Sequence, residues 1–582
     1  MSAASLAFDA PFAAPAPVPR TGPRAAQPAW RAPAEVAAPD ALERARARLM
    51  LALLAFVAVT LLILIRLVWL AAFAGAPKLA PAPAGWVSPR ADIVDRNGVA
   101  LARGIESYAV VVRPKQLVTP PELLAPRLAA LLNRDPAMML ARLRGGPKRL
   151  SSYLARRATP ELRRAVQALG DPGIDFAAEP SRAYPNTPLA QHLVGYVGDD
   201  GHGMAGMEYA ADRGLRGQAG APLSLSIDTR VQQALESELA AGMAKHSALG
   251  AAGVVMDVET GEVIALASLP TYDPAKPADI HDDGRRNHAT LGVYELGSTF
   301  KALTLAMAFD SGVSRMSDRY DARRPIPIGR FVIHDDHPQN RILSVPEIFI
   351  HSSNIGTARI AAQLGEARQR DYLARLGFMK PLQIELPERG RPILPPTWGA
   401  SAVMTVGFGH GISVTPVHLA TAYAALVNGG IWRPATVLRV APGQARVGTR
   451  VFSVQTSDQM RALLRLVVLK GTARQADARG YRIGGKTGTS NKVEGGKYSH
   501  TKVVSTLAAA FPMEKPRYVV VAMLDQPQGT KDTYGFRTAG WVSAPIVRKL
   551  VQRIAPILGV APDLTHDVSV EGLLPGDAKA EE

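Results

Sequence analysis

The longest run of hydrophobic positions lies near the N-terminus. Residues 49–65 carry no charged side chain, and a second apolar run, 67–76, follows Arg66. As one helix, this stretch is long enough to cross a bilayer core of about 30 Å. Three arginines stand directly before it, and this bias of basic residues predicts a cytoplasmic N-terminus. The pattern therefore predicts one membrane span, with most of the chain on the far side of the membrane.

A cleaved secretory signal is the alternative interpretation of this run. Ala74, Gly75 and Ala76 are small residues of the kind that a signal peptidase accepts. The apolar stretch exceeds the roughly 7–15 residues of a signal core, which favours an uncleaved anchor. Arg66 has two interpretations: its side chain snorkels to the outer interface, or it makes a polar contact with the transmembrane helix of a partner.

Beyond the span, the pattern changes at about residue 222. Apolar residues flank Asn97 and Gly98, as in a β-hairpin, and residues 120–170 have helical spacing, so the first part predicts an irregular α+β module. The second part has longer apolar runs that are rich in β-branched residues. They predict strands over 223–227, 253–258, 262–267 and 518–524, and helices over 231–239 and 544–554.

A central antiparallel sheet flanked by helices accounts for the second part, so the predicted fold class is α+β. We call this part the sheet domain and the module before it the pedestal. The predicted order is a disordered cytoplasmic tail at 1–45, the transmembrane anchor at 46–77, the pedestal at 78–222, the sheet domain at 223–560 and a frayed C-terminal tail at 561–582.

Composition and charge narrow the classes of function. Of the 582 residues, 47% are hydrophobic and 20% are charged, which is typical of folded protein. The net charge of +17 is spread along the whole chain, which argues against nucleic acid as a partner and fits contact with an anionic lipid bilayer. There is no cysteine, so disulfides, thiolate metal sites and a cysteine nucleophile are excluded.

Ser298 and Lys301 are the first candidates for catalysis. They begin an apolar helical run through Phe309, and their three-residue spacing puts them on one helical face. A serine hydroxyl needs a base within hydrogen-bonding reach, and a lysine can serve only if burial or a second cation lowers its pKa. Alone, this pair is a weak signal, because ordinary helix surfaces often carry it.

Ser352 and Asn354 form a second candidate pair, just before another helical stretch. The hydroxyl can relay a proton to a leaving nitrogen, and the amide can orient Lys301 and the substrate. Helix capping is the alternative role for both residues.

The sequence Lys-Thr-Gly-Thr at 486–489 is the most specific of the three strings. Lys486 supplies the second cation, and the threonines offer hydroxyls to a carboxylate. The glycine, on an edge strand, lets a bound backbone approach closely. The backbone N–H groups of Ser298 and Thr489 would then form an oxyanion hole, so the three strings together predict acyl transfer through an acyl-enzyme.

In order and spacing, these strings resemble the class B penicillin-binding proteins, which are monofunctional peptidoglycan D,D-transpeptidases. The resemblance runs from the membrane span to about residue 555 and includes shorter strings around Asp95, Arg182, Glu208 and Gly261. The glycine-rich stretch 407–416 resembles the division-specific type more than the elongation-specific type.

The resemblance implies that Ser298 attacks a D-Ala-D-Ala stem peptide, releases D-Ala and passes the acyl group to an amine of a neighbouring strand. It implies catalytic roles for Ser298, Lys301, Ser352, Asn354 and Lys486. The substrate-binding residues that we predict are Ser353, Lys486, Thr487, Gly488, Thr489 and Tyr498.

The resemblance also implies binding of β-lactams, no metal and no cofactor. The expected partners are a membrane-embedded glycan polymerase and other proteins of the division machinery. The expected location is the bacterial inner membrane at the division septum, with the catalytic domain in the periplasm.

Other functions stay open. An elongation-specific transpeptidase, a β-lactam sensor or β-lactamase, and a nonenzymatic wall scaffold are the alternatives. Serine β-lactamases are usually half this length, and we find no resemblance to their E-x-x-L-N string. The family often has proline where Leu296 stands, which we expect to loosen the approach to the nucleophile turn.

The histidines and aspartates at 334–337 have two interpretations. They are of the residue types that bind metals, but four adjacent side chains rarely all point at one ion. We therefore favour a solvated loop. His410, in the glycine-rich stretch, is predicted to be structural.

Overall fold

The computed structural model divides the chain into two units, Met1–Pro83 and Ala84–Glu582. The predicted disordered tail up to residue 38, the small residues at 74–76 and the residues that follow them up to residue 89 lie outside the described part. The residues that the structure describes are 39–73, 90–145, 151–179, 181–217, 221–274, 282–329, 331–441, 443–444, 446–494 and 497–574.

The first unit contributes one long helix, α1 (Pro39–Phe73). Its stretch Arg46–Ile65 has a mean hydropathy of 2.7, and no part of that stretch is buried against protein. The helix is long and apolar enough to cross a membrane, in agreement with the predicted span. The side chain of Arg66 lies outside the described residues, so both interpretations of it stay predictions.

The pedestal begins with the predicted hairpin. Strands β1 (Ile93–Val94) and β2 (Ala100–Ile105) pair in antiparallel fashion, and Gly98 between them has φ +85°, which a glycine adopts without strain. The hairpin prediction is confirmed. Strands β6 (Ser181–Ala183) and β7 (Leu223–Ser224) complete this four-stranded sheet.

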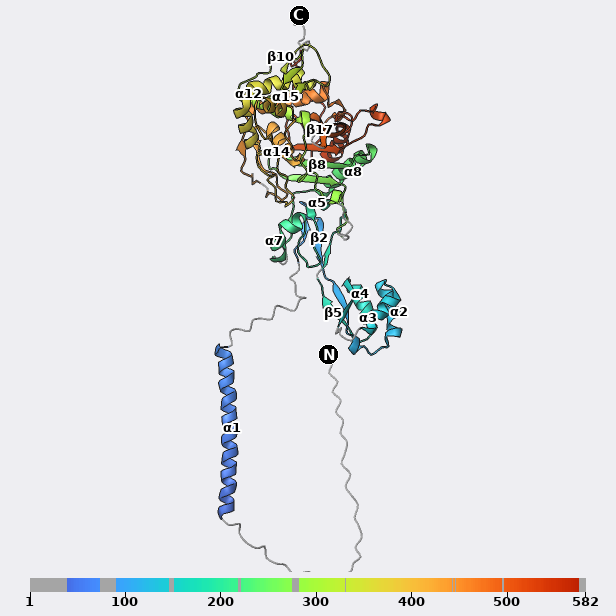
Figure 1. Ribbon diagram of the computed structural model, residues 1–582, viewed down its shortest axis with the longest axis vertical. Helices are drawn as coiled ribbons and strands as arrows, with labels where there is room; N and C mark the ends of the chain where they lie inside the picture. The colour runs from blue at the N-terminus through green and yellow to red at the C-terminus, as the bar shows by residue number, and fades with distance from the viewer. Residues whose placement is uncertain are drawn as a thin grey trace, which may run out of the picture. The chain divides into compact units, whose positions relative to one another are not determined.

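Figure 1 shows a smaller lobe of the pedestal that contains α2, α3, α4 and β5. Its own hydrophobic core includes Val110, Leu124 and Leu128. The predicted helical spacing over 120–170 is interrupted by a strand, β4, which pairs with β3 and buries Leu154 and Ala158 in this core. The lobe consists of β3 (Tyr108–Val112), β4 (Ser152–Ala158), β5 (Ile174–Ala178), α2 (Pro121–Leu132), α3 (Pro136–Arg144) and α4 (Pro160–Gln167).

Buried charges tie the pedestal together. Glu208, in the short helix α6 (Gly206–Ala210), is fully buried, and its carboxylate accepts hydrogen bonds at 2.6 Å from Arg90 and from Arg182. Arg90 also pairs with Asp212 at 2.6 Å. A buried carboxylate is costly unless it is paired in this way, so removing either arginine would leave an uncompensated charge.

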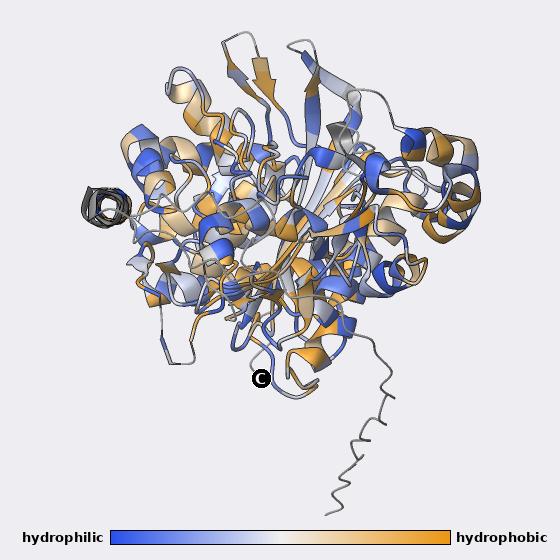
Figure 2. Cartoon of the chain, turned by 90° about the horizontal axis from the view of Figure 1, so that it is seen from below, coloured by the Kyte–Doolittle hydropathy of each residue, from blue (hydrophilic) through white to orange (hydrophobic). Residues whose placement is uncertain are grey.

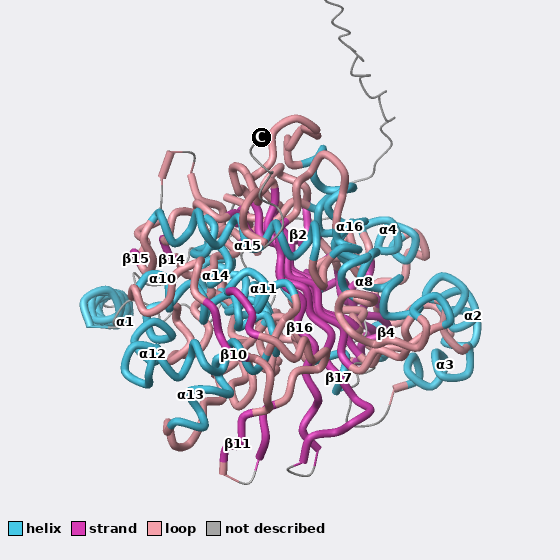
Figure 3. The backbone as a smooth tube through the Cα atoms, turned by 90° about the horizontal axis from the view of Figure 1, so that it is seen from above, coloured by secondary structure: helices cyan, strands magenta, loops and turns pink. Residues whose placement is uncertain are grey.

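The sheet domain is built on five antiparallel strands in the order β16-β17-β18-β8-β9. Figure 3 shows β16 and β17 of this sheet side by side. The hydrophobic residues, orange in Figure 2, follow these strands through the middle of the domain. The strands are β8 (Gly250–Asp257), β9 (Val263–Leu269), β16 (Gly484–Glu494), β17 (Lys497–Phe511) and β18 (Tyr518–Asp525).

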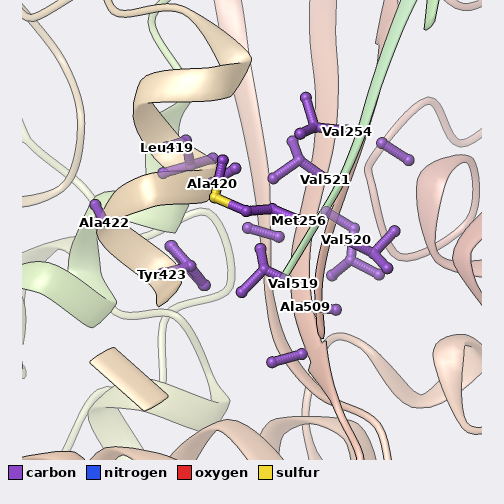
Figure 4. Close-up of a cluster of buried hydrophobic side chains, with 14 of the residues drawn as sticks. Val254, Met256, Leu419, Ala420, Ala422, Tyr423, Ala509, Val519, Val520 and Val521 are labelled. Atoms are coloured by element: carbon purple, nitrogen blue, oxygen red, sulfur yellow. The ribbon is translucent and has the colours of Figure 1, made fainter. Parts of the chain in front are cut away.

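Helices cover both faces of this sheet. Helices α8 (Thr229–Lys245) and α16 (Ser543–Ile557) pack together against one face, and α14 (Pro416–Val427) packs against the other. In Figure 4, Leu419 and Tyr423 of α14 lie against strand residues such as Met256 and Val519. Because both faces are buried, β8, β9 and β18 are apolar over almost their whole length, which is why their pattern is a continuous run rather than an alternation. The predicted α+β fold class is confirmed.

The predicted strand at 223–227 forms only over Leu223–Ser224, where it pairs with β1 of the pedestal. The other predicted strands and helices of the sheet domain are present. The remaining elements used below are α10 (Phe300–Asp310), β11 (Ile326–Ile328), β12 (Phe331–Ile333), α11 (Val345–Ile350), α12 (Asn354–Arg375), α13 (Ala400–Gly407) and α15 (Val454–Lys470).

The C-terminal segment 561–574 is ordered against the sheet domain, so the prediction of a frayed end is wrong for these residues. Asp567 pairs with Arg465 of α15 at 2.7 Å, and Arg482 donates to the carbonyl of Asp563 at 2.5 Å. Val568 and Val570 pack against the main core. The carboxylate of Asp567 is thus the partner of a buried arginine. Residues 575–582 lie outside the described part.

Candidate active site

Ser298 lies in a single 3-10 turn, Gly297–Thr299, directly before α10. The turn is fixed from two sides: the Thr299 hydroxyl donates to the carbonyl of Leu296 at 2.9 Å, and the Tyr423 hydroxyl donates to the carbonyl of Thr299 at 2.8 Å. Leu296 is buried, and its side chain belongs to the main core. The effect expected from leucine in place of proline stays a prediction.

Ser352 and Ser353 link α11 to α12. Ser352 has φ +58°, a left-handed conformation that is strained for serine. Ser353 caps α12 by accepting from the backbone N–H of Gly356 at 3.0 Å. Asn354 is the first residue of α12, and its amide donates to the carbonyl of His334 at 2.9 Å. The predicted contact between this amide and Lys301 is not formed.

One hydroxyl joins the three strings. The Nζ atoms of Lys301 and Lys486 each lie 3.0 Å from the Oγ of Ser352. Lys301 also donates to the carbonyl of Ser352, and Lys486 donates to the carbonyl of Thr487 at 3.1 Å. The structure thus brings Lys301, Ser352 and Lys486 together. The Ser298 hydroxyl is partly exposed and forms no hydrogen bond with any residue that the structure describes.

Both lysines are fully buried, and this burial controls their charge. Loss of solvation lowers the pKa of Lys301 to about 7, although the carboxylates of Asp336 and Asp335 oppose the shift. Burial, followed by the nearby charge of Lys301, lowers the pKa of Lys486 well below its ordinary value. We expected burial or a second cation to lower the pKa of Lys301, and the main cause is burial. A neutral lysine is therefore available near neutral pH to act as a base.

The Lys-Thr-Gly-Thr string lies on β16, at the edge of the sheet. A Cβ atom on Gly488 would lie 2.2 Å from the carbonyl oxygen of Leu296. The glycine therefore makes room for the nucleophile turn, a role that differs from the expected approach of a bound backbone. This close packing puts Ser298 and Thr489 at the same edge of the sheet. The oxyanion hole formed by their N–H groups stays a prediction.

The threonines of the string already have protein partners. The hydroxyl of Thr487 is 2.6 Å from the hydroxyl of Thr472. The hydroxyl of Thr489 accepts from the backbone N–H of Ala539 at 3.1 Å. A substrate carboxylate bound here would share or replace these partners.

Tyr498 lies on β17 and is 45% exposed. Its hydroxyl donates to the carboxylate of Glu295 at 3.0 and 3.2 Å, and the same carboxylate accepts from the N–H of Gly411 at 2.9 Å. The ring of His410 meets that of Tyr498 edge-on, with centroids 5.7 Å apart. Burial and the charge of Lys301 lower the pKa of His410 to about 4, so this imidazole is neutral at physiological pH.

Sequence reasoning missed Glu295. Its position three residues before Ser298 was the available signal, but only the fold shows that it links the nucleophile turn to Tyr498 and to the glycine-rich stretch. Burial raises the pKa of this carboxyl. Figure 3 shows the β16–β17 ribbon and the β11–β12 hairpin projecting from the same side of the domain.

The loop 334–337 supports the second string. Asp335 is 7% exposed, and its carboxylate accepts from the Ser353 hydroxyl at 2.7 Å and from the Ile355 N–H at 2.9 Å. The solvated-loop interpretation is therefore wrong for Asp335, although His334, Asp336 and His337 are exposed. Within the described ranges, no three or more metal-ligating side chains are grouped so that they could hold an ion.

Comparisons with known proteins agree with this geometry. Residues 251–552 match the family profile described as penicillin binding protein transpeptidase domain, and residues 86–253 match the penicillin-binding protein dimerisation domain. The chain is 41% identical over 504 residues to a protein of Caulobacter vibrioides named probable peptidoglycan D,D-transpeptidase FtsI. That alignment covers 84% of this chain and 85% of the relative.

Two further comparisons extend this result. Peptidoglycan D,D-transpeptidase FtsI of Escherichia coli K12 is 30% identical, over 81% of this chain and 84% of that protein. Among solved structures, penicillin binding protein 3 of Mycobacterium tuberculosis, complexed with aztreonam, superposes with a TM-score of 0.64. It has 24% identity, over 82% of this chain and 97% of that structure, and this likeness concerns the fold alone.

Proposed function

Since this chain belongs to the family of penicillin-binding proteins with a transpeptidase domain, we propose that it cross-links peptidoglycan stem peptides through an acyl-enzyme on Ser298. The observation that carries the proposal is the pair of buried lysines on the Ser352 hydroxyl, one of them on the strand that packs against the turn that holds Ser298. The family relationship identifies the reaction as D,D-transpeptidation, and the lysine pair supplies a base for a serine nucleophile.

In the first half-reaction, the neutral amine of Lys301 takes the proton of Ser298 as Oγ attacks the carbonyl carbon of the penultimate D-Ala. The C–O bond forms, and the C–N bond to the terminal D-Ala breaks. The leaving nitrogen receives a proton through the Ser352 hydroxyl, which accepts hydrogen bonds from Lys301 and Lys486. The terminal D-Ala departs, and an ester to Ser298 remains.

Lys486 has a second role in this proposal. It is the cation of the edge strand that would lie beside a bound peptide, so it attracts the substrate carboxylate together with Thr487 and Thr489. The N–H groups of Ser298 and Thr489 would stabilise the negative oxygen of the tetrahedral intermediate. Ser353, Gly488 and Tyr498 line or shape the same cleft.

We also propose a role in division, because two of the relatives carry the name FtsI and the glycine-rich stretch 407–416 resembles that type. In this proposal the protein is anchored by α1 in the inner membrane at the septum. Its N-terminus is cytoplasmic, its catalytic domain is periplasmic, and a membrane-embedded glycan polymerase of the division machinery is its partner. A fluorescent fusion should gather at midcell, whereas a uniform side-wall signal would favour the elongation role.

The reaction is tested with the full-length chain in lipid vesicles, supplied with nascent glycan strands that carry pentapeptide stems. Mass spectrometry should detect released D-Ala and dimeric cross-linked stems, and both should be absent with Ser298→Ala. Release of D-Ala without dimers would identify a hydrolase. The absence of both products from the wild type would support a sensor or a scaffold.

A further inference from the structure

Asp336 occupies a defined place at the active site. The two residues before it are held against the second string: the carbonyl of His334 accepts from the Asn354 amide, and the Asp335 carboxylate accepts from Ser353 and Ile355. The backbone of the loop is therefore fixed next to the start of α12. The side chain of Asp336 leaves this anchored segment and is exposed.

The negative charge of Asp336 acts on three side chains of the active site. Its carboxylate raises the pKa of Lys301, of Lys486 and of His410 against the larger effect of burial. These three side chains come from α10, β16 and the loop after α13. Because the residues just before Asp336 are bonded to Ser353 and Asn354, its carboxylate starts from a backbone that is fixed beside the second string.

The neighbouring carboxylates are already occupied. Asp335 is bonded to Ser353 and Ile355, and Glu295 is bonded to Tyr498 and Gly411. Within the residues that the structure describes, Asp336 has neither a hydrogen bond nor an ion pair. Its carboxylate is therefore free to bind a charged group of a substrate.

The second half-reaction needs such a group. The acceptor amine of a neighbouring stem peptide arrives mainly as an ammonium ion, and whichever of the two lysines carries a proton repels it. A carboxylate facing the cleft attracts the ammonium and compensates for this repulsion. On the basis of the proposed transpeptidase function, we propose that Asp336 binds the acceptor ammonium and so favours transfer to an amine over hydrolysis.

The chemical step is balanced as follows. The bound ammonium gives one proton to the neutral amine of Lys301 and becomes a free amine. Its nitrogen attacks the ester carbonyl, the new C–N bond forms, and the bond between that carbon and the Oγ of Ser298 breaks. The second proton of the nitrogen passes to Oγ, which restores the serine hydroxyl, and Lys301 then releases the first proton to solvent, which restores its neutral amine. Asp336 forms no covalent bond in this step.

The test compares the full-length wild type with Asp336→Asn, using a thioester of an acylated D-alanine as the donor. Two acceptors are supplied in turn: a stem peptide with a free side-chain amine, and hydroxylamine, a small nucleophile that is uncharged at neutral pH. Asp336→Asn should raise the KM for the cationic stem peptide about fivefold and shift product toward hydrolysis, because the ion pair at a partly exposed site is modest. Transfer to hydroxylamine should change less than about twofold.

Two controls separate this role from a structural one. Asp336→Glu keeps the charge and should recover most of the affinity for the stem-peptide amine. Asp371→Asn removes an exposed carboxylate near the end of α12, away from the second string, and should behave as wild type. Acylation by penicillin should be unchanged within about twofold in all three variants, which a general distortion of the site would not allow.

The outcomes distinguish the two proposals. An unchanged KM for the stem-peptide amine in Asp336→Asn, with normal transfer, overturns the role of Asp336 and leaves the transpeptidase function standing. An equal loss with both acceptors also overturns it, because the effect would then not depend on acceptor charge. A wild type that acylates but transfers to neither acceptor overturns the proposed function itself.

Discussion

Lys301 and Lys486 are held on either side of one hydroxyl oxygen, with each Nζ 3.0 Å from the Oγ of Ser352. Two ammonium ions this close in a site without solvent would repel each other strongly, so at least one of the amines is neutral near pH 7. The relationship explains how a serine can be activated here without histidine. It also makes the charge of this pair the quantity that experiments should perturb.

The pH dependence of acylation follows from the pKa of Lys301. Burial lowers this pKa to about 7, and only the neutral amine can accept the proton of Ser298. The acylation rate by penicillin should therefore rise with pH through about 7 and level off above it. Below pH 7, the rate should fall by about tenfold per pH unit. Stopped-flow acylation of the wild type between pH 5 and 9 measures this profile, and a flat profile would contradict the assigned base.

Lys486→Ala should slow acylation by about 100-fold, because it removes a buried donor that lies beside the Ser352 hydroxyl and the substrate carboxylate. Lys492→Ala is the matched control, since Lys492 lies on the same strand but pairs with Asp525. Its acylation rate should stay within about twofold of wild type. An unchanged rate in Lys486→Ala would remove this lysine from the mechanism.

Gly488→Ala should displace the nucleophile turn, because its Cβ would lie 2.2 Å from the backbone oxygen of Leu296. Neither backbone can yield easily, so we expect a loss of about 1–3 kcal/mol in the free energy of unfolding together with a large loss of acylation. Thermal unfolding and penicillin labelling measure the two effects.

Gly214→Ala is the control for this substitution. Nothing lies within 4 Å of a Cβ at Gly214, which is in helix α7 (Asp212–Gly217), and alanine favours helix. Gly214→Ala should keep or slightly raise stability and leave labelling unchanged. Equal behaviour of the two variants would show that the close approach at Gly488 does not matter.

Asp335→Ala and Asp336→Asn should separate two neighbouring carboxylates by their effects on folding. The first change leaves the Ser353 hydroxyl and the Ile355 N–H without their acceptor, which should cost about 1–3 kcal/mol of stability and slow acylation. The second change touches no hydrogen bond and should leave the melting temperature unchanged. Melting curves of both variants decide this, and a normal melting temperature for Asp335→Ala would contradict the supporting role of the loop.

Much of this arrangement was predictable from the sequence. The apolar runs that became β8 and β18 identified the central sheet, because a sheet covered on both faces needs strands that are apolar throughout. The motif spacing singled out Ser298, Lys301, Ser352 and Lys486, and the fold joins the last three through one hydroxyl.

The missed features depend on contacts between segments that are distant in the chain. Asp335 resembled any solvated aspartate until its contact with Ser353 was known, and Asp567 resembled a residue of a loose end until its pairing with Arg465 was known. The steric need for glycine at position 488 could not be predicted from the sequence either, because only the fold places this residue against Leu296. Local patterns specify elements, whereas such tertiary contacts specify which polar side chains are buried and paired.

The most direct test of the central claim is a pulse of fluorescent penicillin on purified wild type and Ser298→Ala, followed by an unlabelled chase and a timed gel. An adduct that persists for many minutes on the wild type, and is absent from a folded Ser298→Ala, is the predicted result. Labelling of Ser298→Ala at unchanged stoichiometry would contradict the nucleophile assignment. Rapid loss of the wild-type adduct would indicate a β-lactamase instead of a transpeptidase.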